Sequence, residues 1–182
     1  MSKFQFPNHV ETLAVICGHE PRTQDYLRLA YLYAWENSQD PKTKNGSVLM
    51  TDDGHLTYGC NHLPEGIAVT EERFADPKIK DPLVEHAETD SILKAGRDGH
   101  ATRNGILYCC WAPCVPCARA IISSGLMSLI THKQMHDRTY EKYRASIETA
   151  IGYLREAGVA YNHFDGFIGG CRGRMADIEW EP

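Results

Sequence analysis

The sequence predicts an α/β protein in which one mixed β-sheet carries helices on both faces. Three observations support this fold class. Helical and strand-like patterns follow one another in the order α-β-β-α-β-α-β-α-β. The chain has 182 residues, of which 42% are apolar and 24% charged, as expected of one globular domain. No repeat, low-complexity stretch or Ser/Gly-rich linker divides it. We therefore expect one domain over 1–182, with its core at 24–163 between an N-terminal extension (1–23) and a C-terminal tail (164–182).

Each expected element depends on a local pattern. Thr23 can cap the first helix, because apolar residues from Leu27 to Trp35 recur at helical spacing. Asp52-Asp53-Gly54 joins two strand-like runs and is typical of a hairpin. Gly158 can stop the clearest helix. The expected helices are 24–37, 86–96, 115–125 and 138–157, and the expected strands are 46–51, 55–60, 105–111, 127–132 and 159–163.

Two segments carry no regular pattern. Residues 61–85 are polar and contain prolines, which predicts a long surface loop, and loops of this length in compact domains are usually functional. The tail from Phe164 is rich in Gly and Arg and receives no assignment. Arg172 and Arg174 could contact a phosphate, but a solvated tail is the favoured interpretation.

Charge and composition exclude several classes of function. The net charge is −5, which argues against a protein whose main partner is long nucleic acid, although a small anionic ligand needs only one or two local cations. No apolar run is long enough to span a bilayer, and the first ten residues lack the apolar core of a signal peptide. We expect a cytoplasmic protein without a membrane partner. Its seven cysteines, an odd count, then indicate thiol or metal chemistry.

One constellation indicates catalysis. His86-Ala87-Glu88 is followed by Pro113-Cys114-Val115-Pro116-Cys117, which matches the H-x-E…P-C-x-x-C pattern of zinc nucleobase deaminases. One imidazole and two thiolates suit a zinc ion and leave its fourth position open for water. Both cysteines lie at the start of an expected helix, where the helix dipole favours the thiolate. Glu88 can reach that water without ligating the metal.

Simpler interpretations exist for each residue alone. A C-x-x-C pair can be a redox pair or half of a structural zinc site, and a His or Glu at a helix start is often a cap or solvated. The order and the strand–helix context together favour a catalytic zinc. The other thiols and imidazoles are expected to have structural roles. Cys60, Cys109 and Cys110 are expected to be small buried apolar residues, and His132 and His136 to be core-edge or surface residues. A second metal site at Cys17 and His19 is disfavoured.

Three further stretches resemble deoxycytidylate (dCMP) deaminases. Ser38–Gly46 is similar to S-x-D-P-x-x-x-V-G, Gly59–Gly66 to G-Y-N-G-x-P-x-G, and Cys114–Gly125 to C-x-x-C-A-x-x-I-I-x-S-G. The resemblance covers about residues 24–163. It implies the cytidine-deaminase-like fold, a three-layer α/β/α sandwich with a five-stranded mixed sheet.

The resemblance also implies roles for single residues. His86, Cys114 and Cys117 would hold one zinc ion per subunit, and Glu88 would be the proton shuttle. Further expected substrate contacts are the Asn61 side chain with the sugar, the Ala87 backbone with the edge of the base, and Trp111 with the base. Simple packing is an equally favoured role for Trp111.

Several positions differ from the family pattern. Asn45 stands where a Val is usual, Asp90 replaces an Asn, and Cys110 replaces a Thr or Ser. Cys60 and His62 replace a Tyr and a Gly in the segment that serves nucleotide regulation in dCMP deaminases.

The expected activity is hydrolytic deamination of a cytosine nucleotide, dCMP to dUMP and ammonia, by a dimer or hexamer. Among the cations of the 61–85 loop, Arg73 is expected to meet the phosphate. Alternatives with the same chemistry are a deaminase of single-stranded DNA or RNA, of dCTP, of a nucleoside or of the free base. A zinc-stabilised binding module without catalysis is an alternative of another class.

Overall fold

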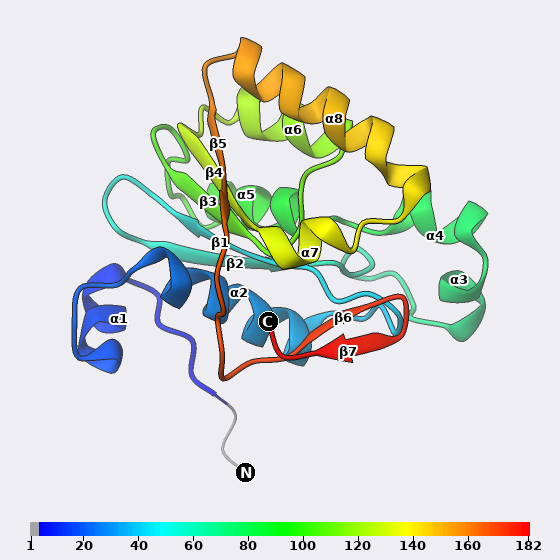
Figure 1. Ribbon diagram of the computed structural model, residues 1–182, viewed down its shortest axis with the longest axis horizontal. Helices are drawn as coiled ribbons and strands as arrows, with labels where there is room; N and C mark the ends of the chain where they lie inside the picture. Colours follow the sequence, from blue (N-terminus) through cyan, green and yellow to red (C-terminus); the bar gives the residue numbers. More distant parts are fainter. Residues whose placement is uncertain (1–3) are drawn as a thin grey trace.

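The computed structural model describes residues 4–182 and has helices on both faces of a five-stranded sheet (Figure 1). The helices are α1 (Val10–Cys17), α2 (Thr23–Asn37), α3 (Glu71–Ala75), α4 (Pro77–Leu83), α5 (Ala87–Arg97), α6 (Val115–Ser123), α7 (Lys133–Asp137) and α8 (Glu141–Glu156). The strands are β1 (Gly46–Met50), β2 (Leu56–Cys60), β3 (Ile106–Cys109), β4 (Ser128–His132), β5 (Ala160–Phe164), β6 (Gly173–Met175) and β7 (Ile178–Trp180). Across residues 4–182, no helix combines the length and apolarity that crossing a membrane requires.

The main sheet is mixed and has the strand order β2-β1-β3-β4-β5. β1 pairs antiparallel with both β2 and β3, whereas β3, β4 and β5 run parallel to one another. The β1–β2 hairpin turns where Asp52-Asp53-Gly54 predicted it, and Gly54 takes a φ of 82° that favours glycine. β6 and β7 form a separate two-stranded hairpin.

Alternating side chains of the central strands fill two apolar layers. Val48 and Tyr108 pack with α2 on one face, and Leu49 and Leu107 pack with α5, α6 and α8 on the other. Figure 1 shows α2 on one side of the sheet, and α5, α6 and α8 on the other. The predicted three-layer α/β/α fold is confirmed. The expectation of a single domain over 1–182 stays a prediction.

The structure differs from the sequence prediction at several places. Thr23 is the first residue of α2 and not its cap: the residue before the helix is Arg22, whose backbone N–H donates to the Asp25 carboxylate at 2.9 Å. The segment 61–85 contains two short helices rather than only loop. The helix expected over 138–157 is observed as α8 over Glu141–Glu156, and a separate short helix that was not predicted, α7, precedes it.

The C-terminal tail is ordered as a hairpin, so the expected solvated tail is wrong. Met175 and Cys171 are buried, which anchors the tail against the α2 face of the sheet. The backbone N–H groups of Ile168 and Gly169 donate to the carbonyl of Pro182 at 3.0 and 2.9 Å. The last residues are therefore tied to the segment that leaves β5.

Candidate active site

A cavity of about 200 Å³ lies where the N-termini of α5 and α6 meet the segment before β1. His86, Glu88 and Cys114 line it beside Asn45, Asn61 and Trp111. Asp40, Thr43 and Lys80 supply further polar groups. The cavity thus gathers residues from the H-x-E motif, the P-C-x-x-C motif and two of the other matching stretches.

The three predicted metal ligands come together. His86 is the residue before α5, Cys114 is the residue before α6, and Cys117 is in the first turn of α6. The Nδ1 atom of His86 lies 3.4 Å from the Cys114 Sγ and 3.3 Å from the Cys117 Sγ, and the two sulfurs are 3.5 Å apart. Zinc bonds of about 2.0 Å to nitrogen and 2.3 Å to sulfur in a tetrahedron separate the donors by roughly 3.5–3.8 Å. The donor set therefore fits one zinc ion.

The local electrostatics favour the metal-binding form of Cys114. A hydrogen bond from the Cys117 thiol lowers the pKa of Cys114 to about 4, and the neighbouring His86 imidazole lowers this pKa as well. Because Cys114 immediately precedes α6, the unpaired N–H groups of that helix also favour a negative charge there. A thiolate is the ligand form that zinc binds.

Glu88 is buried beside these donors. Its side chain is 2% exposed, and burial raises its pKa to about 7. The Glu88 Oε2 atom accepts a hydrogen bond of 3.5 Å from Asn45 Nδ2. Glu88 is not one of the three converging donors, so its carboxylate can exchange protons in the cavity. A group that titrates near neutrality can both accept and donate a proton under physiological conditions.

Asn45 is a site residue that sequence reasoning noted only as a departure from the family. Its Oδ1 atom accepts the backbone N–H of Trp111 at 3.1 Å, while its Nδ2 reaches Glu88. Asn45 therefore connects the strand end that carries Trp111 to the buried carboxylate. The only signal in the sequence is a polar amide where an apolar residue is usual, just before a buried strand.

Asn61 lines the cavity, but its side chain is already bonded within the chain. The Oδ1 atom accepts from Ser38 Oγ at 2.6 Å and from the backbone N–H of Asn45 at 2.9 Å. The Nδ2 group donates to Thr43 O at 2.7 Å and to Asp40 Oδ2 at 3.3 Å. An amide has two donors and two acceptor positions, so all four are used. In this structure Asn61 fixes the 38–45 segment, and the expected bond to a sugar would require one of these bonds to exchange.

Trp111 and Ala87 take different places. Trp111 lines the cavity, and its Nε1–H donates to Thr139 Oγ1 at 2.8 Å while its ring packs edge-to-face on Tyr143 at 5.7 Å. It is therefore held as a cavity wall. Ala87 is fully buried and is not among the cavity-lining residues. Its carbonyl accepts from Ser47 Oγ at 2.7 Å, so that oxygen is used to join α5 to β1.

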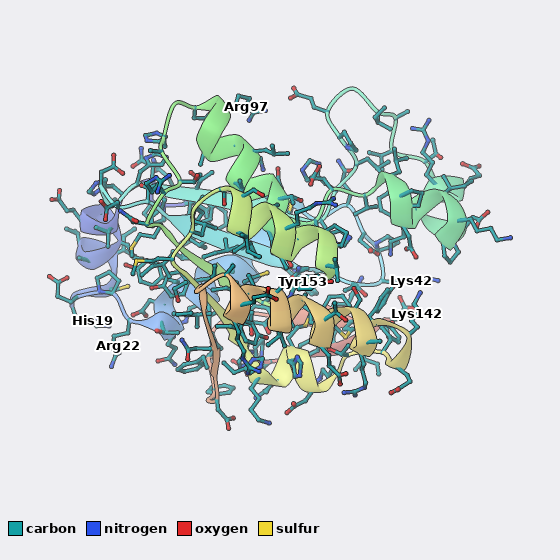
Figure 2. The ribbon with its side chains drawn as sticks, turned by 90° about the horizontal axis from the view of Figure 1, so that it is seen from above. His19, Arg22, Lys42, Arg97, Lys142 and Tyr153 are labelled. Atoms are coloured by element: carbon teal, nitrogen blue, oxygen red, sulfur yellow. The ribbon has the colours of Figure 1, made fainter. Side chains whose placement is uncertain are left out.

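Arg73 is not brought to the cavity. Its guanidinium donates to the nearby carbonyl of Ala68, because the segment folds into α3 and turns the side chain back on its own loop. Lys80, in α4, lines the cavity instead, with its Nζ 2.5 Å from Asp40 Oδ2. Lys42 and Lys142, each next to a cavity-lining residue, project at the same end of the molecule (Figure 2).

Three positions that differ from the family pattern meet behind α5. The Asp90 carboxylate contacts His62 Nε2 at 3.1 Å, Lys94 Nζ at 2.7 Å and the backbone N–H of Cys60 at 3.0 Å. Burial alone would raise the pKa of Asp90, but the bonds from His62 and Lys94 outweigh it and lower this pKa. The bond to Asp90 raises the pKa of His62. His62, Asp90 and Lys94 thus form one ion cluster around a buried carboxylate, to which Cys60 contributes only its backbone N–H.

The remaining candidates have structural roles. Cys60, Cys109 and Cys110 are buried, and His132 is fully buried with its Nδ1 2.9 Å from the Tyr31 hydroxyl. Cys17, His19 and Asp25 form a second group of possible metal donors among the described residues. The Asp25 carboxylate is already bonded by the Arg22 backbone and the Arg28 guanidinium, so its charge is compensated without a metal.

Comparisons with known proteins agree with this geometry. Residues 21–133 match the family model described as the cytidine and deoxycytidylate deaminase zinc-binding region. The deoxycytidylate deaminase of Mus musculus is 27% identical over 147 residues, which cover 76% of this chain and 77% of that protein. An uncharacterised deaminase of Aliivibrio fischeri is 30% identical over 67% of this chain and 80% of its own length.

Solved structures give the same fold. The dCMP deaminase of the cyanophage S-TIM5 in apo form has a TM-score of 0.61 at 19% identity, covering 78% of this chain and 96% of that one. Its complex with dCMP and dUMP has a TM-score of 0.59 at 21% identity, covering 76% of this chain and 93% of that one. The zinc-binding region matched by sequence and the compatible donor cluster at His86, Cys114 and Cys117 together identify zinc as the cofactor of this fold.

Proposed function

The chain belongs to the cytidine and deoxycytidylate deaminase family, and from this premise we propose that it deaminates dCMP to dUMP with release of ammonia. One observation carries the proposal: the His86, Cys114 and Cys117 donors converge on a cavity that an unligated, buried carboxylate also lines. The relatives named deoxycytidylate deaminase support the choice of substrate.

His86, Cys114 and Cys117 hold the zinc ion in this proposal. When bound, zinc acts as a Lewis acid that brings the pKa of a water molecule towards neutrality. Glu88 takes a proton from the attacking water and passes it to N3 of the cytosine ring as the C4–O bond forms. Glu88 then transfers the second proton to the amino group on C4. The C4–N bond breaks, ammonia leaves and a carbonyl remains at C4.

Asn45 and Trp111 position the reacting groups. The bond from Asn45 to Glu88 keeps the carboxylate turned towards the cavity. Trp111, held by Thr139, offers an aromatic wall against which a pyrimidine can pack. Ala87 and Asn61 were expected to contact the base and the sugar. Ala87 does not line the cavity, so its backbone contact with the base stays a prediction, and we assign Asn61 to positioning the 38–45 segment.

Lys80 replaces Arg73 as the proposed phosphate contact. It lines the cavity with its side chain 22% exposed, and the Asp40 carboxylate beside it is already bonded by the backbone N–H groups of Lys42 and Thr43. One partly buried cation suits a single phosphate group. The net charge of −5 argues against a polynucleotide as the substrate, because clustered positive charge supplies most of the affinity for long nucleic acids.

The family resemblance also supports a cytoplasmic homo-oligomer, a dimer or a hexamer, whose size is measurable by light scattering. The decisive test of the activity is ammonia release from dCMP, dCTP, cytidine, cytosine and an oligonucleotide by the zinc-loaded protein. The proposal expects the highest kcat/KM with dCMP. Preference for the oligonucleotide would favour the polynucleotide alternative, which Trp111 supports, and release from none of the five would favour a non-catalytic zinc module.

A further inference from the structure

The hairpin formed by β6 and β7 lies about 40 residues beyond the region that matches the family model. It packs beside α2 and the segment that leads into β1 (Figure 1). That segment supplies Asp40, Thr43 and Asn45 to the cavity. The hairpin is therefore in contact with a wall of the active site although it contributes no lining residue of its own.

The turn of the hairpin donates two hydrogen bonds to this wall. The backbone N–H of Asp177 donates to Lys42 O at 3.1 Å, and that of Ala176 to Thr43 Oγ1 at 3.4 Å. Both turn residues are left-handed, with φ of 64° for Asp177 and 56° for Ala176. Residues other than glycine rarely adopt left-handed backbone, so the surrounding contacts hold this turn in place. The strained turn is thus the part of the hairpin that meets the cavity wall.

Arg174 in β6 adds two more bonds to the same wall. Its carbonyl accepts the backbone N–H of Lys44 at 3.0 Å, and its Nη1 donates to the carbonyl of Pro41 at 2.8 Å. The guanidinium also lies 5.4 Å over the Trp35 ring and pairs with Glu179. Arg174 consequently ties the hairpin to the 41–44 segment at both ends of that segment.

A second route connects the hairpin to the part of the cavity wall that Trp111 forms. The Arg138 guanidinium lies 4.4 Å over the ring of Trp180 in β7. The next residue, Thr139, accepts the indole N–H of Trp111. Gly173 allows this packing, since a Cβ there would lie 2.6 Å from the Trp180 ring. One hairpin therefore supports both the 40–45 wall and the Trp111 wall.

We propose that the C-terminal hairpin positions the substrate pocket, with Arg174 as a positioning residue that sets the affinity for the nucleotide. Asn61 holds the 40–45 segment from within, and the hairpin holds it from outside. This segment makes no regular secondary structure of its own before Lys44, so its place depends on these bonds. The inference rests on the proposed deaminase function.

The test compares R174M with R174K. Methionine keeps an apolar stem beside Trp35 and removes the donor to Pro41, whereas lysine keeps one cationic donor. We expect KM for dCMP to rise about fivefold in R174M, as for the loss of one hydrogen bond, and to return towards the wild-type value in R174K. The kcat per bound zinc should stay within about twofold. I178A, at a 64% exposed side chain of the same hairpin, is the matched control with an unchanged KM.

These readouts separate positioning from general stabilisation. Partial unfolding lowers the active fraction, and so the rate, but leaves KM unchanged. An unchanged KM in R174M would overturn the inference. If R174M does not fold, R174Q takes its place, because glutamine keeps a polar side chain but loses the Nη1 donor to Pro41, and an unchanged KM in R174Q would overturn the inference. Failure of the wild-type protein to release ammonia from dCMP would reject the proposed function instead, and dCMP affinity measured by calorimetry would then decide the role of the hairpin.

Discussion

Replacing Glu88 with glutamine tests the proposed chemistry most directly. Glutamine has the same shape, and it can still pair with Asn45 through its amide oxygen, so the cavity should keep its form. The zinc donors are unchanged, since Glu88 is not one of them. The substitution removes only the ability to accept and return a proton.

The size of the effect follows from the number of proton transfers. General acid–base catalysis by a positioned group contributes about 10²–10⁴-fold, and the proposed mechanism gives Glu88 two proton transfers in each turnover. Two other carboxylates line the cavity, and of these Asp40 is held by Lys80 and by two backbone N–H groups. We therefore expect kcat to fall by about 10⁴ or more, equivalent to roughly 5.5 kcal/mol of barrier at 1.36 kcal/mol for each factor of ten.

The assay is ammonia release from dCMP, with the zinc content and the melting temperature measured on the same preparation. E85Q is the control. It neutralises a carboxylate three residues before Glu88 that contacts Thr89 and does not line the cavity. Its rate of ammonia release should stay within about twofold of the wild-type rate. More than a tenth of wild-type turnover in zinc-loaded E88Q would refute the role of Glu88 as the proton shuttle.

Three further predictions concern binding and stability. K80M should raise KM for dCMP while leaving KM for deoxycytidine unchanged; an equal change for both substrates in steady-state kinetics would contradict the phosphate contact. D90N should cost about 1–3 kcal/mol in chemical denaturation, because it breaks a buried ion cluster. The lowered pKa of Asp90 contributes stability above about pH 4, and this contribution is lost as the pH falls through the lowered pKa. The raised pKa of His62 contributes stability below about pH 6.5, and this contribution is lost as the pH rises through the raised pKa. In D90N the unfolding free energy should therefore depend less on pH in both ranges. G59A would place a Cβ 2.1 Å from the Ala87 carbonyl, a backbone atom, so we expect a loss of about 3 kcal/mol or more and a low yield of folded protein.

The ligand motifs were predictable from the sequence because their geometry is local. His86 and Cys114 each immediately precede a helix, and Cys117 follows Cys114 by one helical turn. Such spacing brings donors to a helix N-terminus in any fold that forms those helices. The meeting of the two helix ends depends on the order of the strands in the mixed sheet, and the fold that places them together was implied by the family resemblance.

Roles that depend on distant partners were not predictable. Asn61 bonds to Ser38, Asp40, Thr43 and Asn45, all of them 16 or more residues away, and no local pattern reports that its amide is saturated. Such a role emerges only when the two segments are folded together.

Two of the elements that the sequence did not predict illustrate different causes. The helix α4 had a local signal that could have been used: Pro77 occupies its first turn and the Asp76 side chain caps it by accepting from Lys78 N–H. The C-terminal hairpin had none, because its turn uses Ala176 and Asp177 in left-handed conformations where Asn-Gly or Asp-Gly is the usual indication.

Because the three donors come from two helices, the supply of zinc affects the stability of the protein. A single ion bound to His86, Cys114 and Cys117 joins the start of α5 to the start of α6. If the unfolded chain does not bind zinc, a free concentration a thousand times the dissociation constant adds about 4 kcal/mol to the unfolding free energy. Zinc depletion would then shorten the lifetime of the folded protein as well as remove its activity. Melting curves recorded with and without a chelator would reveal the loss of stability.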